Sequence, residues 1–296
     1  MPLERATNIA TGSTITPRMP PLFAGIAELS GGADVFPCID DLNRMLASER
    51  RSGALRFAAQ TPDLLADGLH YEERIARHGI IATRENTPHD AFNALIWLRH
   101  TELKRAMNAR QVADIARVGS KERTRGQCAL THFDEAGAIV WIAARDALTA
   151  WDAHDWPALF RVHADEWGRR IAVTIVGHAL YEYALMHKTL PVAKALVVAV
   201  DADDITARCT DGASIASWPE AERAVAEEIA AGRLLADPQE LRPLPFAGIP
   251  AWQSAVPTDE FYRTTPCFRP LRAGRRYPSA AVLRIPTRIP APQSSG

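Results

Sequence analysis

The chain has 296 residues, of which 34 are Lys or Arg and 35 are Asp or Glu, so its formal net charge is -1. This balance excludes a general attraction to nucleic acid or anionic membranes, and the hydrophobic fraction of 47% is typical of a soluble globular protein. The longest apolar run, within 171–186, is interrupted by His178 and Glu182, which excludes a membrane-spanning helix. We therefore expect no membrane association, no strong nucleic-acid signal and, because residues 1–20 lack the apolar core of a secretory signal, a cytoplasmic location.

The first half of the chain contains clear helix signals. Residues 1–25 are predicted to be a mobile N-terminal segment, and residues 54–59 could form a strand. Apolar residues at helical spacing and a glycine cap at Gly79 predict helices. The predicted helices are 39–48, 71–78, 88–99 and 101–118.

The middle of the chain contains the clearest strand signal. Residues 128–134 and 138–143, separated by the turn residues 135–137, are predicted to form a β-hairpin. The apolar pattern of 169–187 predicts one long helix, and the continuous apolar run 194–201 predicts a buried strand. Further helices are expected at 145–153, 157–167 and 217–232.

No break in composition divides the chain into two domains. Frequent prolines after Leu241 break regular structure, and residues 278–296 are predicted to be a disordered tail. We therefore predict a helix-rich α+β fold, with one globular domain over 26–277 and a small sheet that includes a β-hairpin near 128–143.

Polar residues are densest around the predicted start of the helix at Pro88. Thr87 and Pro88 are typical of a helix start, with Thr87 as the cap. His89 and Asn93 then share one helical face, and Arg84 and Asn86 precede the helix, where its N-terminus favours an anion. This region, residues 84–93, is the helix-start segment and the first candidate site.

Several blocks in this order resemble an uncharacterised bacterial family, domain of unknown function 3025. The blocks are HYEERIARHGIIATRENTPHDAFNALIWL (70–98), LKRAMNA (103–109), LTHFDEAG (130–137), GHALYEYAL (177–185), PLPFAGIPAWQ (243–253) and FYRTTPCFRPLR (261–272). The chain departs from the family pattern at Pro88, where an aromatic residue is common, and at Arg263, where an acidic residue is common. The resemblance implies a single module and supplies no activity.

Two residues of the helix-start segment have structural explanations as well as functional ones. A histidine at a helix start favours the neutral imidazole that general-base work or metal binding needs, so His89 leads the candidates. Asp90 could orient a histidine or bind a metal, but a capping role would explain it equally well. Adjacent helical residues point about 100° apart, so His89 and Asp90 cannot both face one small ligand without help. Asn93 could brace a loop or contact a ligand.

A second pair is His178 and Glu182, which lie four residues apart and share a helical face. The pair could complete a site with His89, or it could be an internal hydrogen-bonded tie, which we favour. The basic cluster at 269–276 is interpreted as solvated surface, with nucleic-acid contact as the minority alternative. The four cysteines form no CxxC pair, and the common nucleotide-binding, α/β-hydrolase and zinc-protease motifs are absent.

Two hypotheses for function follow. In the first, the protein is a hydrolase or lyase acting on a small anionic substrate held by Arg84 and Asn86. His89 would be the acid/base or the ligand of a divalent metal, supported by Asp90, Asn93 or the His178–Glu182 pair. In the second, the protein is a non-catalytic binding or regulatory protein, and the polar cluster is a structural network.

Overall fold

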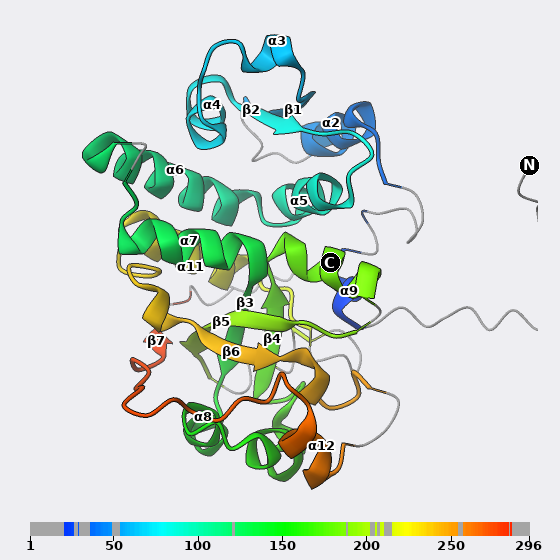
Figure 1. Cartoon of the computed structure of the whole chain (residues 1–296), viewed down its shortest axis with the longest axis vertical. Helices are drawn as coiled ribbons and strands as arrows, with labels where there is room; N and C mark the ends of the chain where they lie inside the picture. Colours follow the sequence, from blue (N-terminus) through cyan, green and yellow to red (C-terminus); the bar gives the residue numbers. More distant parts are fainter. Residues whose placement is uncertain are drawn as a thin grey trace, which may run out of the picture.

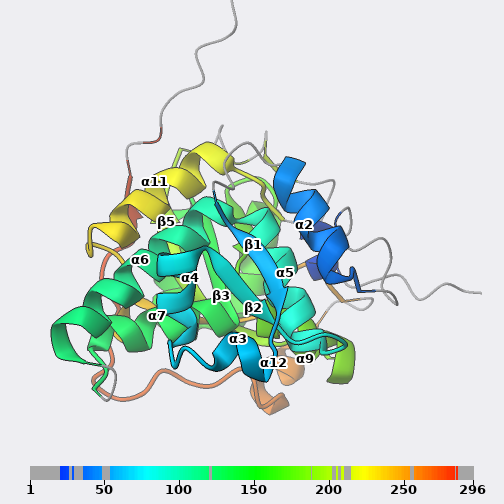
Figure 2. The ribbon, with the colours of Figure 1, turned by 90° about the horizontal axis from the view of Figure 1, so that it is seen from above.

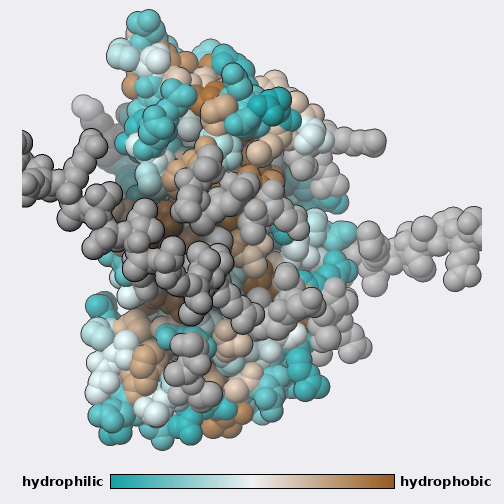
Figure 3. All heavy atoms as spheres, turned by 90° about the vertical axis from the view of Figure 1, so that its right-hand side faces the viewer, coloured by the Kyte–Doolittle hydropathy of each residue, from teal (hydrophilic) through white to brown (hydrophobic). Residues whose placement is uncertain are grey.

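The structure, a computed structural model, describes residues 21–285 except 27–28, 30–35, 49–53, 120–121, 188, 202–204, 206–207, 210–214, 254–256 and 284. The described part is arranged in layers, with helices on both sides of a central sheet (Figure 1). In Figure 3, hydrophobic residues are visible around the middle of the face, and hydrophilic residues are more frequent toward both ends. Among the described residues, no helix combines the length and apolarity that crossing a membrane requires.

A small unit lies at the top of the molecule in Figure 1. Its strands β1 (Arg56–Ala59) and β2 (Ile80–Thr83) pair in parallel, joined by α3 (Pro62–Leu65) and α4 (Tyr71–His78). Gly79 caps α4 in the left-handed conformation, with a φ of 65°, which glycine adopts readily. The helices α2 (Ile39–Ser48) and α4 flank the strand pair when it is seen from above (Figure 2).

A layer of helices lies between this unit and the sheet (Figure 1). Its members are α5 (Pro88–Arg99), α6 (Thr101–Val118), α7 (Arg125–Ala136), α9 (His178–His187) and α11 (Pro219–Ala230). The buried pair of His100 and Glu222, whose Nδ1 and Oε2 atoms are 2.7 Å apart, ties the α5–α6 junction to α11. The Nε2 atom of His100 also lies 3.1 Å from the carbonyl oxygen of Ile175, so this junction is fixed to the sheet as well.

The sheet among the described residues has five strands. They are β3 (Gly137–Ile142), β4 (Ile171–Ile175), β5 (Val192–Ala199), β6 (Arg242–Pro245) and β7 (Ala281–Val282). The order is β4-β3-β5-β6, and β7 also pairs with β5. The central pair, β3 and β5, is parallel, with Gly137 opposite Lys194, and every residue of β3 is buried. Such a strand, covered on both faces, has a continuous apolar sequence.

Shorter elements complete the fold. They are η1 (Pro21–Gly25), α8 (Arg145–Asp152), η2 (Ala158–Val162), η3 (Ala164–Glu166), η4 (Pro238–Glu240), η5 (Phe246–Gly248) and α12 (Asp259–Thr264). The helices α8 and α12 lie below the sheet in Figure 1, on the side away from α7 and α9.

The predicted helix-rich α+β fold is confirmed, but the hairpin predicted near 128–143 is wrong. Residues 125–136 form helix α7, which leads directly into β3, and β3 pairs with β4 and β5 instead of with the preceding segment. The long helix predicted over 169–187 is also wrong, because β4 ends at Ile175 and α9 begins at His178. In both places buried residues lie on either side of the change between helix and strand, so the pattern of hydrophobicity did not mark where one element ends and the next begins.

The predicted ends of the domain also need adjustment. Residues 21–25, expected in the mobile segment, form η1, and its Leu22 and Phe23 are buried. Within the predicted tail, β7 (Ala281–Val282) pairs with β5. Residues 1–20 and 286–296 lie outside the described residues.

Candidate functional site

Two glycines allow the ends of α7 and β4 to meet. The backbone amides of Val176 and Gly177 both donate to the carbonyl oxygen of Gly137, at 3.0 and 2.8 Å. A Cβ atom on Gly177 would lie 2.3 Å from the backbone nitrogen of Gly137, so this close approach requires glycine. As a result, Glu135 at the end of α7 lies beside His178 at the start of α9.

The first residue pair of the site is formed by His89 and His178. His89 lies in the first turn of α5, which packs against α9. The two Nε2 atoms are 3.1 Å apart, and the rings are nearly perpendicular at 82°. The structure therefore brings together the two histidines that the sequence placed in separate candidate pairs.

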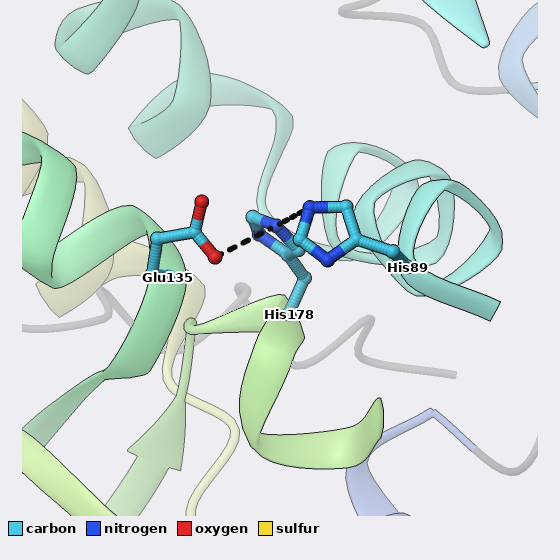
Figure 4. Close-up of side chains that lie close together, drawn as sticks. All are labelled: His89, Glu135 and His178. Atoms are coloured by element: carbon cyan, nitrogen blue, oxygen red, sulfur yellow. Dashed lines mark hydrogen bonds and ion pairs between the residues drawn. The ribbon is translucent and has the colours of Figure 1, made fainter. Parts of the chain in front are cut away.

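Glu135 is the third member of this group. Its Oε2 atom lies 3.5 Å from the Nε2 atom of His178, on the side away from His89 in the projection of Figure 4. One ligand atom from each of His89, Glu135 and His178 lies within 4.8 Å of the other two. We call these three residues the His-Glu-His cluster.

Glu182 supports the cluster from outside. Its Oε2 atom lies 2.8 Å from Nδ1 of His89, the nitrogen that does not face His178. A proton on Nδ1 donated to this carboxylate leaves the lone pair of Nε2 directed at His178. Glu182 thus fixes the orientation and tautomer of His89. The spacing in the sequence had suggested that Glu182 pairs with His178, but its hydrogen-bond partner is His89.

The cluster is open on one side. The side chain of His178 is only 3% exposed, whereas those of Glu135 and His89 are 46% and 35% exposed. Burial lowers the pKa of His178 to about 4, so its ring is neutral at pH 7. Burial also raises the pKa of Glu135. The buried Nδ1 atom of His178 has no hydrogen-bond partner among the described residues. The backbone of Asp134 acts to raise the pKa of the His178 ring, against the larger effect of burial.

A closed polar network lies next to the cluster. Lys104, which is 4% exposed, forms an ion pair with Asp134 and donates to Oδ1 of Asn93 at 3.0 Å. Asn93 in turn donates to the hydroxyl of Tyr71 at 3.1 Å, and Trp97 donates to the same hydroxyl at 3.3 Å. Burial alone would raise the pKa of Asp134, but Lys104 holds it below its usual value. Both ends of the Asn93 amide are therefore used in bracing α5 against α4 and α6.

The remaining residues of the helix-start segment hold the preceding loop. Asp90 accepts from the backbone amide of Arg84 at 2.6 Å and from its guanidinium at 3.2 and 2.8 Å. Thr87 makes no side-chain cap, contrary to our prediction, and its hydroxyl donates to the carbonyl of Arg84 at 2.9 Å. Asn86 is exposed with a φ of 59°, the left-handed conformation that Asn tolerates in turns.

Two histidines and a carboxylate in this arrangement match the ligand set of catalytic zinc and of non-haem iron sites. The same geometry could also serve general-base catalysis, with His89 oriented by Glu182. The sequence predicted His89, His178 and Glu182 but missed Glu135, Asp134 and Lys104. Glu135 was assigned to a hairpin turn, although the capping box formed by Thr124 and Gln127 identifies a helix start before it.

Comparison with known proteins identifies the family. Residues 55–272, more than half of the chain, match the family described as "Protein of unknown function (DUF3025)". The chain therefore belongs to this family, and the matched range includes the whole His-Glu-His cluster and Glu182. No curated protein and no solved structure matches the chain.

Proposed function

We propose that this member of the DUF3025 family is a hydrolase that binds a divalent metal ion through His89, His178 and Glu135. The observation that carries the proposal is the pair of Nε2 atoms 3.1 Å apart, with a carboxylate oxygen 3.5 Å from one of them. Two nitrogens each about 2.0–2.1 Å from a tetrahedral zinc ion are about 3.3–3.4 Å apart, so the observed separation needs little adjustment.

The surroundings of the cluster favour a bound metal. With Nδ1 of His89 donating to Glu182, the lone pair on Nε2 faces His178, where a metal or a shared proton satisfies both rings. Carboxylate support of a ligating histidine is a regular feature of protein metal sites. The buried, neutral His178 supplies a second nitrogen without the cost of removing a proton at pH 7.

An open coordination position is what separates a catalytic site from a structural one. Three protein ligands leave a position for water, and the exposed sides of Glu135 and His89 give solvent access to it. A divalent ion held by His89, His178 and Glu135 would supply the Lewis-acid activation of water that hydrolysis needs.

A small anion is the proposed substrate, on the charges of the metal ion and of Arg84, whose guanidinium is also paired with Asp90. Arg84 keeps 54% of its side chain exposed, and Glu182 acts on its guanidinium electrostatically, so Arg84 lies near the cluster. The metal and Arg84 would both attract an anion. Asn86 belongs to the turn that presents Arg84, and it would act on the substrate through that turn.

The test is a metal analysis followed by activity measurements. We expect purified protein to contain close to one equivalent of zinc or another divalent ion per chain, with the metal lost in His89→Ala and His178→Ala. His132→Ala is the matched control, because His132 is an exposed histidine on α7 near Glu135. The wild type and variants are then assayed on phosphate-ester, carboxylic-ester and amide substrates, with and without a chelator. A wild-type protein that binds no added zinc, manganese or iron would refute the proposal.

The alternative function is a non-catalytic binding or regulatory protein. The closed network of Lys104, Asp134, Asn93 and Tyr71 favours it, because these groups satisfy one another and stabilise helix packing. A protein that binds one metal ion tightly but hydrolyses none of the substrates, with or without a chelator, would support this alternative.

A further inference from the structure

A cavity of about 560 Å³ lies beside β5 and β6, and none of its described lining residues belongs to the His-Glu-His cluster. It is bounded by the first residues of β5, by β6, by residues 154–156 and by the C-terminal segment 266–277. This segment runs below the sheet, on the side away from α7 and α9 (Figure 1). The cavity therefore shares no described lining residue with the proposed metal site.

The cavity is lined by positive charge. Lys194 of β5 and Arg269, Arg272 and Arg275 of the C-terminal segment all line it, and none of the described lining residues is Asp or Glu. We interpreted residues 269–276 as solvated surface, and Arg269, Arg272 and Arg276 are exposed. Three arginines of this cluster also border the cavity, together with a lysine distant in sequence.

Two acidic groups near the cavity are paired with other arginines. Asp237, next to the lining residue Pro238, binds Arg125 at 2.8 Å, although Arg275 also acts on it electrostatically. Asp152 binds the buried Arg242 at 2.6 Å. Like charges that share a concave, low-dielectric surface concentrate a positive potential, which an anion relieves.

Part of the positive wall is held in place before any ligand arrives. Arg275 donates to the carbonyl oxygen of Gln239 at 2.7 Å, and its guanidinium lies 4.4 Å from the centre of the Tyr277 ring. The Tyr277 hydroxyl lies 2.8 Å from Nε2 of His154, and the carbonyl of Arg269 accepts from Trp156 at 2.9 Å. A site with such fixed groups loses little conformational entropy on binding.

We propose that this cavity binds a small molecule carrying at least two negative charges, through Lys194, Arg269, Arg272 and Arg275. The shared ligand chemistry is a phosphorylated or multiply carboxylated group, which guanidinium groups bind with paired hydrogen bonds. The volume fits a metabolite-sized ligand and is too small for a folded partner.

The test is calorimetric titration of the full chain with inorganic pyrophosphate and, separately, with citrate at low ionic strength. We expect saturable binding of at least one of them, and the stronger ligand distinguishes phosphate from carboxylate chemistry. Arg272→Gln and Arg275→Gln should each weaken binding about tenfold or more. The matched control is Arg276→Gln, because Arg276 is an exposed neighbour that does not line the cavity, and it should change the affinity less than twofold.

Three results would overturn the proposal. One is the absence of binding by the wild type to either anion. Another is equal weakening by Arg276→Gln, which would indicate general surface charge. The last is much tighter binding of a single-stranded oligonucleotide than of pyrophosphate, with affinity rising with its length, which would indicate a nucleic-acid surface. Arg272 is exposed, so Arg272→Gln should fold normally and keep the test decisive if Arg275→Gln does not.

Discussion

The role of Glu182 gives the sharpest test of the proposed metal site. Glu182→Gln keeps an oxygen that can accept from Nδ1 of His89 but removes the negative charge that makes the imidazole a better ligand. Loss of such a supporting carboxylate typically weakens metal binding about 10- to 100-fold, or about 1.4–2.7 kcal/mol. The side chains of Glu182 and His89 are 26% and 35% exposed, and solvent screens the lost charge, so we expect a loss near tenfold.

The assay is a zinc titration in competition with a chromophoric chelator, carried out on metal-free protein. Glu135→Gln, which replaces a proposed ligand, should weaken binding by more than Glu182→Gln does. Glu227→Gln is the control, because Glu227 is exposed on α11, and it should leave the affinity unchanged. An unchanged affinity in Glu182→Gln would refute the supporting role, and a loss as large as that of Glu135→Gln would make Glu182 a ligand.

Three further changes test the surroundings of the site. Lys104→Met leaves the Asp134 carboxylate without its buried cation and should lower the free energy of unfolding, measured in urea, by about 3 kcal/mol. Asp134→Asn should destabilise the Lys104→Met variant much less than it destabilises the wild type. Gly177→Ala forces the backbones of residues 137 and 177 apart and should lower the free energy of unfolding, measured by thermal denaturation, by about 2 kcal/mol or more. It should also weaken zinc binding by moving His178. A variant with wild-type stability and zinc affinity would contradict the close approach. Burial raises the pKa of Glu72, so its carboxyl stabilises the fold below its unfolded pKa of 4.5 and this stabilisation is lost as pH rises through the folded value. Glu72→Gln should therefore be more stable than the wild type at pH 7 but not at pH 4, which urea unfolding at both pH values would check.

Local signals predicted the helices between residues 39 and 118 well. The helices found at Ile39–Ser48, Tyr71–His78, Pro88–Arg99 and Thr101–Val118 have the predicted bounds. Each is marked by apolar periodicity or by a terminal signal such as Pro88 or Gly79, and these signals act within a few residues along the chain.

The middle of the chain was mispredicted because its elements are buried and follow one another without a break. The helix α7 ends at Ala136 and β3 begins at Gly137, so no loop separates them. Alternation within 128–134 resembles a strand, and only the Thr124 capping box shows that a helix has started. In 169–187 the only marker of the change from strand to helix is Gly177, whose role depends on the distant Gly137.

The same limit applies to the candidate site. His89, His178 and Glu182 were identified because a histidine or acid in an apolar helix is conspicuous in sequence. Their pairing was not predictable, because it depends on the packing of α5 against α9. His89 and Glu182, which this packing brings together, are 93 residues apart in the sequence. Glu135 was missed because its assignment to a hairpin turn already explained it.

The two hypotheses drawn from sequence describe neighbouring parts of one region. The direction of each side chain around α5 separates them: Asn93 reaches the closed network, Asp90 holds the Arg84 loop, and His89 faces α9. Asp134 joins the parts, because it pairs with Lys104 inside the network while the next residue, Glu135, faces His178. A satisfied, buried network fixes its members in one arrangement, so it can hold ligands from three helices in place before a metal arrives. The structural network thus supports the proposed metal site, which is why loss of Lys104 should weaken zinc binding as well as stability.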